Sequence, residues 1–300
     1  MIDTRTREEA PAGSRALPPR DRWLGMGLVV LGLGAALVSV AGPLILGLID
    51  YRASPGAVNQ VMGGDVAGLV LVAPTSILAG ILAWRGHRAG GVLGLGPALY
   101  ALYMYSQLAL GGDVFRYPGN SERFFLLYLG LFLLAGAVTV RAWTGIDSGA
   151  LPDLGRGTDR TLGIFLLVVA SFLLLGLHLP GLIDAWSAQP EGAEYLADPV
   201  VFWVVKFMDL GLVVPGLVAA AVGILGRTSW GAKVKYAAVG WAALLGASVA
   251  GMAIVMQVTG DPAASTANTA AFSLFAAIAL AMAVRAYIPL FDRFAGNDLP

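Results

Sequence analysis

Three charged residues interrupt long apolar segments of this 300-residue sequence: Asp65, Lys206 and Asp209. A charge in the middle of a membrane-spanning helix costs about 3 kcal/mol on insertion scales, so it normally serves a function or has a partner. Together the three residues can line a polar cavity that holds an ion or a small solute. Alternatively, Lys206 and Asp209 pair across one helical turn, and Asp65 hydrogen-bonds to a neighbouring tyrosine or glutamine.

A polar stripe of Tyr100, Tyr103 and Gln107 follows the spacing of one helical face within the segment 91–110. Polar groups on one face of an apolar helix should point toward protein and away from lipid. The hydroxyl groups can hydrogen-bond to a ligand, or they can be buried against neighbouring helices. These three residues are therefore candidate ligand-binding residues.

Arg116 and Arg123 are further candidates and lie in the chemically most varied loop, residues 111–123. A guanidinium group can bind a carboxylate, a phosphate or a lipid headgroup. The alternative is a salt bridge from these arginines to Asp113 or Glu122 of the same loop.

His178 is the last candidate ligand-binding residue and lies near the outer end of a predicted helix. Histidine changes its charge near neutral pH and can relay protons if an acidic residue is close, and Asp50 and Asp184 are the candidate partners if the two repeats pack closely. The chain has two histidines and no cysteine, and no spacing of acidic residues indicates a metal site. The motifs of nucleotide-binding proteins, zinc proteases and serine hydrolases are absent. We therefore predict no catalytic residue, no metal and no cofactor.

These candidates belong to a chain with the composition of a membrane protein. Hydrophobic residues make up 57% of it, charged residues make up 13%, and the mean hydropathy is +0.76. Nineteen Lys and Arg residues balance nineteen Asp and Glu residues, which argues against nucleic-acid binding. A membrane-spanning helix needs roughly 20 apolar residues. Eight segments qualify: 23–49, 61–83, 91–110, 124–140, 161–183, 199–225, 236–258 and 267–284.

The distribution of Lys and Arg predicts the orientation of these helices. With the N-terminus inside, fifteen of the nineteen basic residues fall in cytoplasmic segments, and only Arg52, Arg116 and Arg123 fall outside. Because basic residues concentrate on the cytoplasmic side, both termini should be cytoplasmic. Arg outnumbers Lys sixteen to three, which is typical of a GC-rich bacterial genome. We therefore place the protein in a bacterial cytoplasmic (inner) membrane.

Similar motifs in the two halves of the chain indicate an internal duplication. Gly-Leu-Ile-Asp occurs at 47–50 and at 181–184, and an aspartate followed by an apolar run and a proline occurs at 65–74 and at 209–215. Four crossings per half return the chain to its starting side, so the two repeats are parallel. The sequence thus predicts an all-α polytopic fold with these parts: a disordered cytoplasmic tail (1–22), a first four-helix repeat (23–143), a cytoplasmic linker (144–160), a second four-helix repeat (161–288) and a cytoplasmic tail (289–300).

Four stretches of the sequence form a further pattern. They are Gly64-Asp65 with residues 69–74, residues 99–105, residues 124–129 and residues 209–215. In this combination they resemble a family of uncharacterised bacterial polytopic membrane proteins, and the similarity covers most of residues 45–230. The resemblance implies an eight-helix integral membrane fold, and it carries no activity that can be transferred.

The sequence leaves three functions open. The first is a protein that handles a small solute, an ion or a lipid, with an outward-facing polar cavity between the repeats. The second is a non-catalytic membrane subunit that scaffolds or modulates a partner. The third is a membrane-embedded enzyme, whose site at the outer face would combine Asp113, Arg116, Glu122, Arg123 and His178. The expected partners are the lipid bilayer, a small solute, ion or lipid, and a membrane protein or a second copy of the chain.

Overall fold

The computed structural model describes residues 20–295, and these residues contain helices and no strands. Twelve α-helices are joined by short 3₁₀ and π segments. The α-helices are α1 (Arg22–Ala41), α2 (Pro55–Ala67), α3 (Ala73–Trp84), α4 (Ala89–Leu110), α5 (Phe125–Gly145), α6 (Gly155–Ser171), α7 (Leu179–Ala185), α8 (Ala193–Ala197), α9 (Pro199–Met208), α10 (Val214–Leu225), α11 (Ser229–Val258) and α12 (Thr266–Ala295). The π segments are η1 (Gly68–Val72), η4 (Phe172–His178) and η5 (Asp209–Val213), and the 3₁₀ segments are η2 (Ser121–Phe124) and η3 (Ser148–Ala150).

Seven helical rods in the described part of the chain are long and apolar enough to cross a membrane. They are Arg22–Ala41, Pro55–Trp84, Ser121–Gly145, Gly155–Ala185, Pro199–Leu225, Ser229–Val258 and Thr266–Asp292. The eighth predicted segment, 91–110, does form a helix, α4, of 22 residues. Its tyrosines and Gln107 lower its mean hydropathy, so α4 is not apolar enough to be counted with these seven rods.

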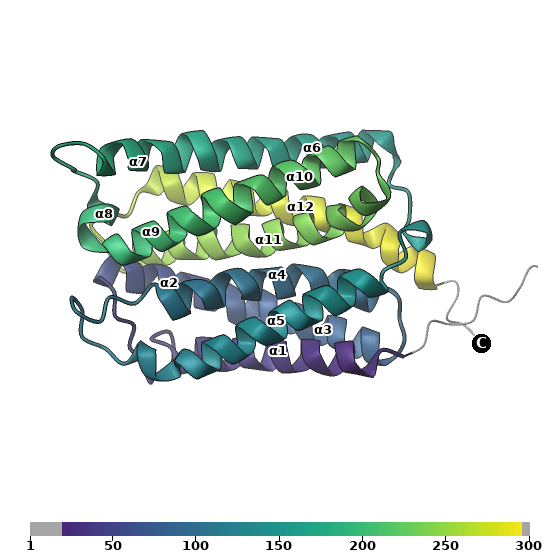
Figure 1. Ribbon diagram of the computed structural model, residues 1–300, viewed down its shortest axis with the longest axis horizontal. Coiled ribbons are helices and arrows are strands. Elements are labelled where there is room, and N and C mark those ends of the chain that lie inside the picture. The colour runs from purple at the N-terminus through teal and green to yellow at the C-terminus, as the bar shows by residue number, and fades with distance from the viewer. Residues whose placement is uncertain (1–19, 296–300) are drawn as a thin grey trace, which may run out of the picture.

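The helices form two halves that lie side by side along their length (Figure 1). Helices α1 to α5 make one half, and α6 to α12 make the other. Within the halves, α1 packs on α3 as α6 packs on α10, and α4 packs on α5 as α11 packs on α12. Helix α11 joins the halves because it also contacts α2 and α4. The start of α1 and the end of α12 lie at the same end of the bundle.

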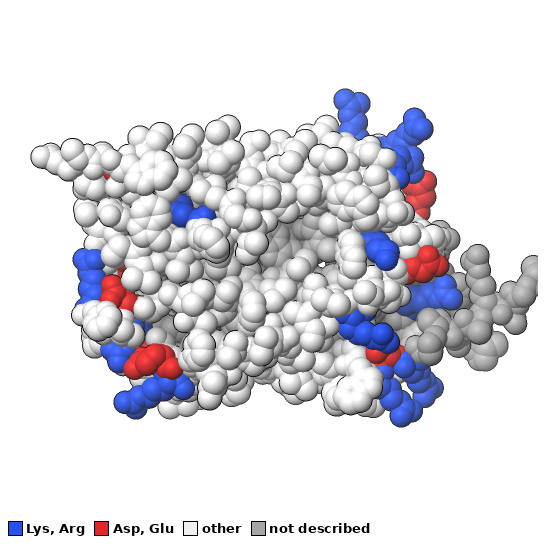
Figure 2. All heavy atoms as spheres, viewed as in Figure 1, with Lys and Arg blue, Asp and Glu red and all other residues white. Residues whose placement is uncertain are grey.

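The surface separates charge from apolar area as a membrane protein requires. Lys, Arg, Asp and Glu side chains gather at the two ends of the bundle, and between them lies a broad band in which this face shows only one small patch of Lys or Arg (Figure 2). Large apolar side chains of the predicted spans, such as Leu126 and Phe207, are about three-quarters exposed. Apolar groups in contact with lipid need no protein cover, so this exposure is expected for helices in a bilayer.

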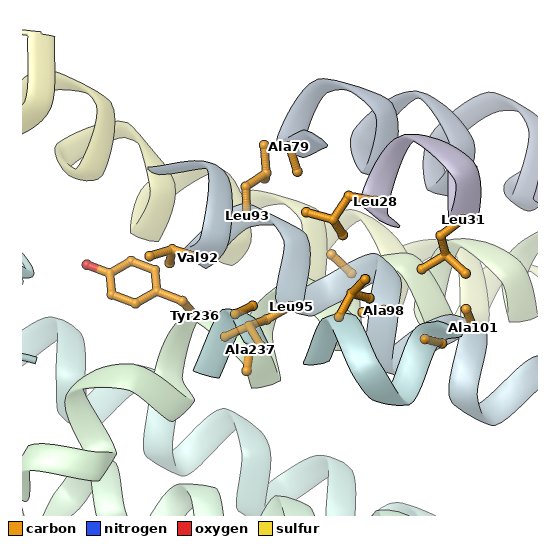
Figure 3. Packing of buried hydrophobic residues seen from close by; sticks show 14 of the residues in the cluster. Leu28, Leu31, Ala79, Val92, Leu93, Leu95, Ala98, Ala101, Tyr236 and Ala237 are labelled. Atoms are coloured by element: carbon orange, nitrogen blue, oxygen red, sulfur yellow. The ribbon is translucent and has the colours of Figure 1, made fainter. Parts of the chain in front are cut away.

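Small residues set the packing inside the bundle. Leu28 and Leu31 of α1 meet Ala98 and Ala101 of α4 in the main apolar core (Figure 3). Between the halves, Gly63 of α2 lies against the backbone of α11, where a side-chain carbon would overlap the backbone of Met252. Close backbone approach of this kind provides the packing contacts that hold helices together in lipid.

The approach of α2 to α11 predicts the effect of a small substitution. Gly63→Ala is expected to destabilise the protein by about 1–3 kcal/mol, because the added methyl group forces the two backbones apart. Gly130→Ala on α5 is the matched control, since a side-chain carbon there has nothing within 4 Å. Thermal unfolding in detergent measures both variants. Equal melting temperatures would show that α2 and α11 are not in close contact.

Several element boundaries differ from the prediction. The first predicted helix, 23–49, ends at Ala41, because the chain turns at Pro43 and Gly47 adopts a positive φ of 59°. The second Gly-Leu-Ile-Asp motif instead lies inside α7, so the two copies of this motif have different structures. Helix α12 continues to Ala295, beyond the predicted repeat end at 288. Residues 1–19 and 296–300, where we predicted cytoplasmic tails, lie outside the described part of the chain.

Each π segment is followed closely by a proline. Pro74 lies at the start of α3 after η1, Pro180 at the start of α7 after η4, and Pro215 at the start of α10 after η5. Proline lacks an amide hydrogen and its ring clashes with the carbonyl group one turn earlier, so the preceding turn is widened here. Pro97 lies inside α4 without such a segment. Proline alone therefore does not determine where the wide turns occur.

Candidate functional site

A buried chain of hydrogen bonds centres on Asp209, the first residue of η5. His178, the last residue of η4, places its Nε2 atom 2.7 Å from Asp209 Oδ2. Tyr103 of α4 donates its hydroxyl hydrogen to Asp209 Oδ1 at 2.7 Å, and Gln107 donates from Nε2 to the Tyr103 hydroxyl oxygen at 3.0 Å. The exposed fractions are 0% for His178 and 6% for Asp209. The three elements that meet here thus enclose an acid–base pair away from water.

This pair has the chemistry of a proton-binding site. Nε2 of His178 faces the carboxylate, and Nδ1 has no hydrogen-bond partner among the described residues. Neutral imidazole and imidazolium differ by one proton, and the adjacent carboxylate compensates the charge of the second form. Both residues border π segments, which are frequent at functional sites in helical proteins. The prediction that Asp50 and Asp184 are the partners of His178 was wrong, because the pairing runs to Asp209.

Lys206 lies one turn before Asp209 and does not pair with it. Its Nζ atom lies 4.3 Å from the ring centroid of Phe202, and the residue is 5% exposed. Within the described residues no carboxylate forms an ion pair with this ammonium group. The alternative in which Lys206 pairs with Asp209 is therefore wrong, since both oxygens of Asp209 are used by His178 and Tyr103. Lys206 instead faces α7, where its Nζ comes close to Gly181.

Asp65 belongs to a different group of residues. It lies on α2, is buried, and has none of the Asp209 cluster as a hydrogen-bond partner. Its Oδ2 atom has no hydrogen-bond partner among the described residues. Asp65, Lys206 and Asp209 therefore do not form one cluster, because each has different neighbouring side chains.

The stripe on α4 faces protein, as predicted. Tyr100 is buried and donates to the hydroxyl oxygen of Ser248 on α11 at 3.1 Å. Tyr103 and Gln107 reach the Asp209 cluster. The same face of α4 thus contacts α11 through Tyr100 and η5 through Tyr103.

Arg116 and Arg123 do not form the predicted contacts with the acidic residues of their own loop. Glu122 accepts two hydrogen bonds from Arg52, to Nε at 2.7 Å and to Nη2 at 2.8 Å, and this contact raises the pKa of Arg52. Arg116 donates from Nη2 to the carbonyl oxygen of Leu196 at 2.8 Å, and the side chain of Asp113 accepts backbone hydrogens of its own turn. Salt bridges from Arg116 or Arg123 to Asp113 or Glu122 are not formed. Because His178 pairs with Asp209, the five residues suggested for an enzyme site do not come together in one cluster.

A second buried ion pair lies at the end of the bundle where α6 and α11 begin. Lys235 Nζ lies 2.9 Å from Asp159 Oδ1, and both residues are 5% exposed. Arg227 Nε lies 3.6 Å from the other oxygen of Asp159, and its Nη2 lies 2.7 Å from Asp153. The backbone hydrogen of Gly155 and then Arg227 hold the pKa of Asp153 below its usual range. The four side chains border a cavity of about 150 Å³.

Asp159 and Lys235 were not among the candidate residues predicted from the sequence. Asp159 and Lys235 lie just before the apolar runs that we used to place helices, so both were assigned to loops. The signal that could have found them is their position, within one turn of the start of a long apolar segment in each case. Helices that continue past the apolar run bring such residues together.

Comparison with known proteins does not identify a family for this chain. No protein-family model, no curated protein and no solved structure matches this chain, so its resemblance to bacterial polytopic membrane proteins stays a prediction.

Proposed function

We propose that this chain is an eight-helix bacterial inner-membrane protein built from two parallel four-helix repeats, with both ends in the cytoplasm. Helix α4 supplies the eighth crossing, since its 22 residues are enough to span a bilayer. An even number of crossings agrees with the start of α1 and the end of α12 lying together (Figure 1). The excess of basic residues in the segments at that end supports the cytoplasmic assignment.

The duplication is supported by local geometry more than by the Gly-Leu-Ile-Asp motif. The stretch from the start of the π segment to the proline has the same length at 68–74 and at 209–215. The two rods then end at the same distance from the proline, in Gly86 with φ 83° and Arg227 with φ 50°. A non-glycine residue at positive φ is uncommon, so the agreement is specific. In this alignment Asp65 corresponds to Lys206, and Asp209 corresponds to Gly68.

We infer further that the protein moves a small carboxylate solute together with a proton. The observation that carries this proposal is the buried His178–Asp209 pair, which can accept and release a proton within the membrane-spanning part. Lys206 supplies a positive charge that forms no ion pair with a carboxylate in the described part of the chain and lies one turn away. A solute carboxylate would compensate that charge. One proton carried with one carboxylate makes the step electrically neutral.

Transport by proteoliposomes tests this proposal. A gradient of a small monocarboxylate across vesicles that contain the protein is expected to drive proton entry, measured with an internal pH-sensitive dye. Asp209→Asn should reduce proton entry at least tenfold, because an amide in place of the carboxylate cannot exchange a proton, and Lys206→Gln should reduce solute uptake similarly. Glu191→Gln, an exposed change in an outer loop, is the control. Vesicles in which the wild type moves neither species, for any of a series of carboxylates, would contradict the proposal.

A further inference from the structure

A cavity of about 150 Å³ lies at the end of the bundle where α10 ends and α11 begins. The charged side chains of Asp153, Asp159, Arg227 and Lys235 line it. A water molecule takes up about 30 Å³ in the liquid, so the cavity has room for a group larger than water. These charged walls make it a candidate site for a polar ligand, separate from the proposed transport site.

The hydrogen bonds already present in the cavity leave mainly donors available to a ligand. Both oxygens of Asp153 accept from Arg227 Nη2 at 2.7 Å, and one of them also accepts the backbone hydrogen of Gly155. Lys235 has three donor hydrogens, and Asp159 Oδ1 is their one acceptor among the described residues. Arg227 Nε lies 3.6 Å from Asp159 Oδ2, beyond hydrogen-bond distance, and its Nη1 has no acceptor in the described part of the chain. A ligand that accepts several hydrogen bonds is therefore favoured.

The charges around the cavity can compensate an anion if one exposed contact is exchanged. The side chain of Asp153 is 67% exposed, so its contact with Arg227 contributes little and can be replaced. Without Asp153, the charges of Lys235 and Arg227 exceed that of Asp159 by one. The N-terminus of α11 adds a partial positive charge, since its N-cap residue Thr228 also lines the cavity. An anion with one negative charge is thus compensated here.

The backbone of Arg227 supports a role for its side chain in this cavity. Its φ of 50° lies in the left-handed region, where a residue with a side chain is strained and glycine is not. The turn after α3, at the same end of the bundle, uses Gly86 at φ 83°. Non-glycine residues in this conformation are concentrated at functional sites. An arginine in a conformation that suits glycine indicates that its guanidinium group is used.

We propose that this cavity binds a phosphate group with one negative charge, carried by a lipid headgroup or by a small soluble phosphate. Lys235 and Arg227 donate hydrogen bonds to its oxygens, and Arg227 exchanges Asp153 for the phosphate. Guanidinium and ammonium groups commonly bind phosphate in proteins, and a phosphate group has more acceptor oxygens than a carboxylate. Trp230, in the first turn of α11, is 41% exposed, as is typical of tryptophan at the level of lipid headgroups.

Thermal unfolding of the delipidated full-length protein in a maltoside detergent tests the site. A ligand that binds only the folded state raises the melting temperature as its concentration rises. The probes are inorganic phosphate, glycerol 3-phosphate and a short-chain phosphatidylglycerol, each compared with sodium chloride and sodium acetate at the same ionic strength. We expect saturable stabilisation by about 3 °C or more. Stabilisation by all three probes identifies a soluble phosphate as a sufficient ligand, and stabilisation by the lipid alone identifies a headgroup site.

Three variants separate binding from structural support. Arg227→Gly should fold well, because glycine adopts the positive φ without strain, yet its apparent affinity for the phosphate probes should fall about tenfold or more. Asp153→Asn should raise the affinity about threefold, since it removes the competing carboxylate. Arg156→Gln removes an exposed positive charge near the start of α6, at the same end of the bundle, and should leave the affinity unchanged.

The inference does not rest on the proposed transport, because it uses another cavity and other residues. Equal melting temperatures in phosphate probes, chloride and acetate would overturn it. An undiminished phosphate effect in Arg227→Gly would do the same, and a weaker affinity in Asp153→Asn would contradict the exchange at Arg227. Binding of radioactive phosphate and phosphatidylglycerol to the purified protein gives the same comparison if a variant is too unstable for thermal unfolding.

Discussion

Asp159→Asn is expected to lower the free energy of unfolding by about 3–5 kcal/mol, because it leaves a buried ammonium group without its carboxylate. Lys235 Nζ lies 2.9 Å from Asp159 Oδ1, and neither residue is more than 5% exposed. Arg227 is 3.6 Å from the other oxygen and is partly exposed, so it can turn toward solvent. Lys235 has no second carboxylate partner in the described part of the chain. The full cost of an unpaired buried charge therefore applies.

The double variant Asp159→Leu/Lys235→Met separates loss of charge pairing from loss of packing. Removing both charges should restore most of the stability, since a buried pair can often be replaced by apolar groups without loss. Chemical unfolding in detergent measures both variants. Asp153→Asn is the exposed control and should change stability little. If Asp159→Asn were no worse than this control, water would have to reach the pair through the neighbouring cavity.

His178→Ala is expected to have an effect of similar size, about 3–5 kcal/mol at neutral pH. It removes the imidazole group from Asp209 Oδ2 and leaves Tyr103 as the remaining partner of a buried carboxylate. The loss should be smaller when Asp209→Asn is added, since the amide is neutral.

Chemical unfolding of the single and double variants in detergent provides the measurement. Tyr100→Phe is the matched control, because it removes one buried hydrogen bond, to Ser248, and no charge. It should cost about 1 kcal/mol with or without Asp209→Asn. An equal loss from His178→Ala with and without Asp209→Asn would show that the loss comes from the cavity and not from an unpaired charge.

The class of fold could be predicted from the sequence because it depends on properties of single segments. Apolar runs of sufficient length placed the seven candidate spans, and the polar stripe on α4 was correctly expected to face protein. The partners of the buried charges depend on how distant segments pack. His178 and Asp209 are 31 residues apart on different rods. Helical spacing favoured Lys206 for Asp209, whereas packing supplied His178 and Tyr103.

Boundaries failed where helices and apolar runs do not coincide. Pro43 explains why α1 ends at Ala41 although the apolar run continues. At the opposite end of the bundle, α6 and α11 begin at Gly155 and Ser229, before their apolar runs. The helical turns gained there carry Asp159 and Lys235. A hydropathy scan measures transfer into lipid, and it therefore does not detect ion pairs formed at the ends of the helices.

The π segments also change the phase of each rod. One extra residue per turn rotates all later side chains by about 100° relative to an uninterrupted α-helix. Compared with an uninterrupted helix, residues after η5, such as Leu217, are therefore rotated about the helix axis relative to residues before it, such as Phe202 and Lys206. A helical wheel drawn through the whole rod Pro199–Leu225 places one of the two sets on the wrong side. The rod therefore presents two differently directed faces, one on each side of Asp209.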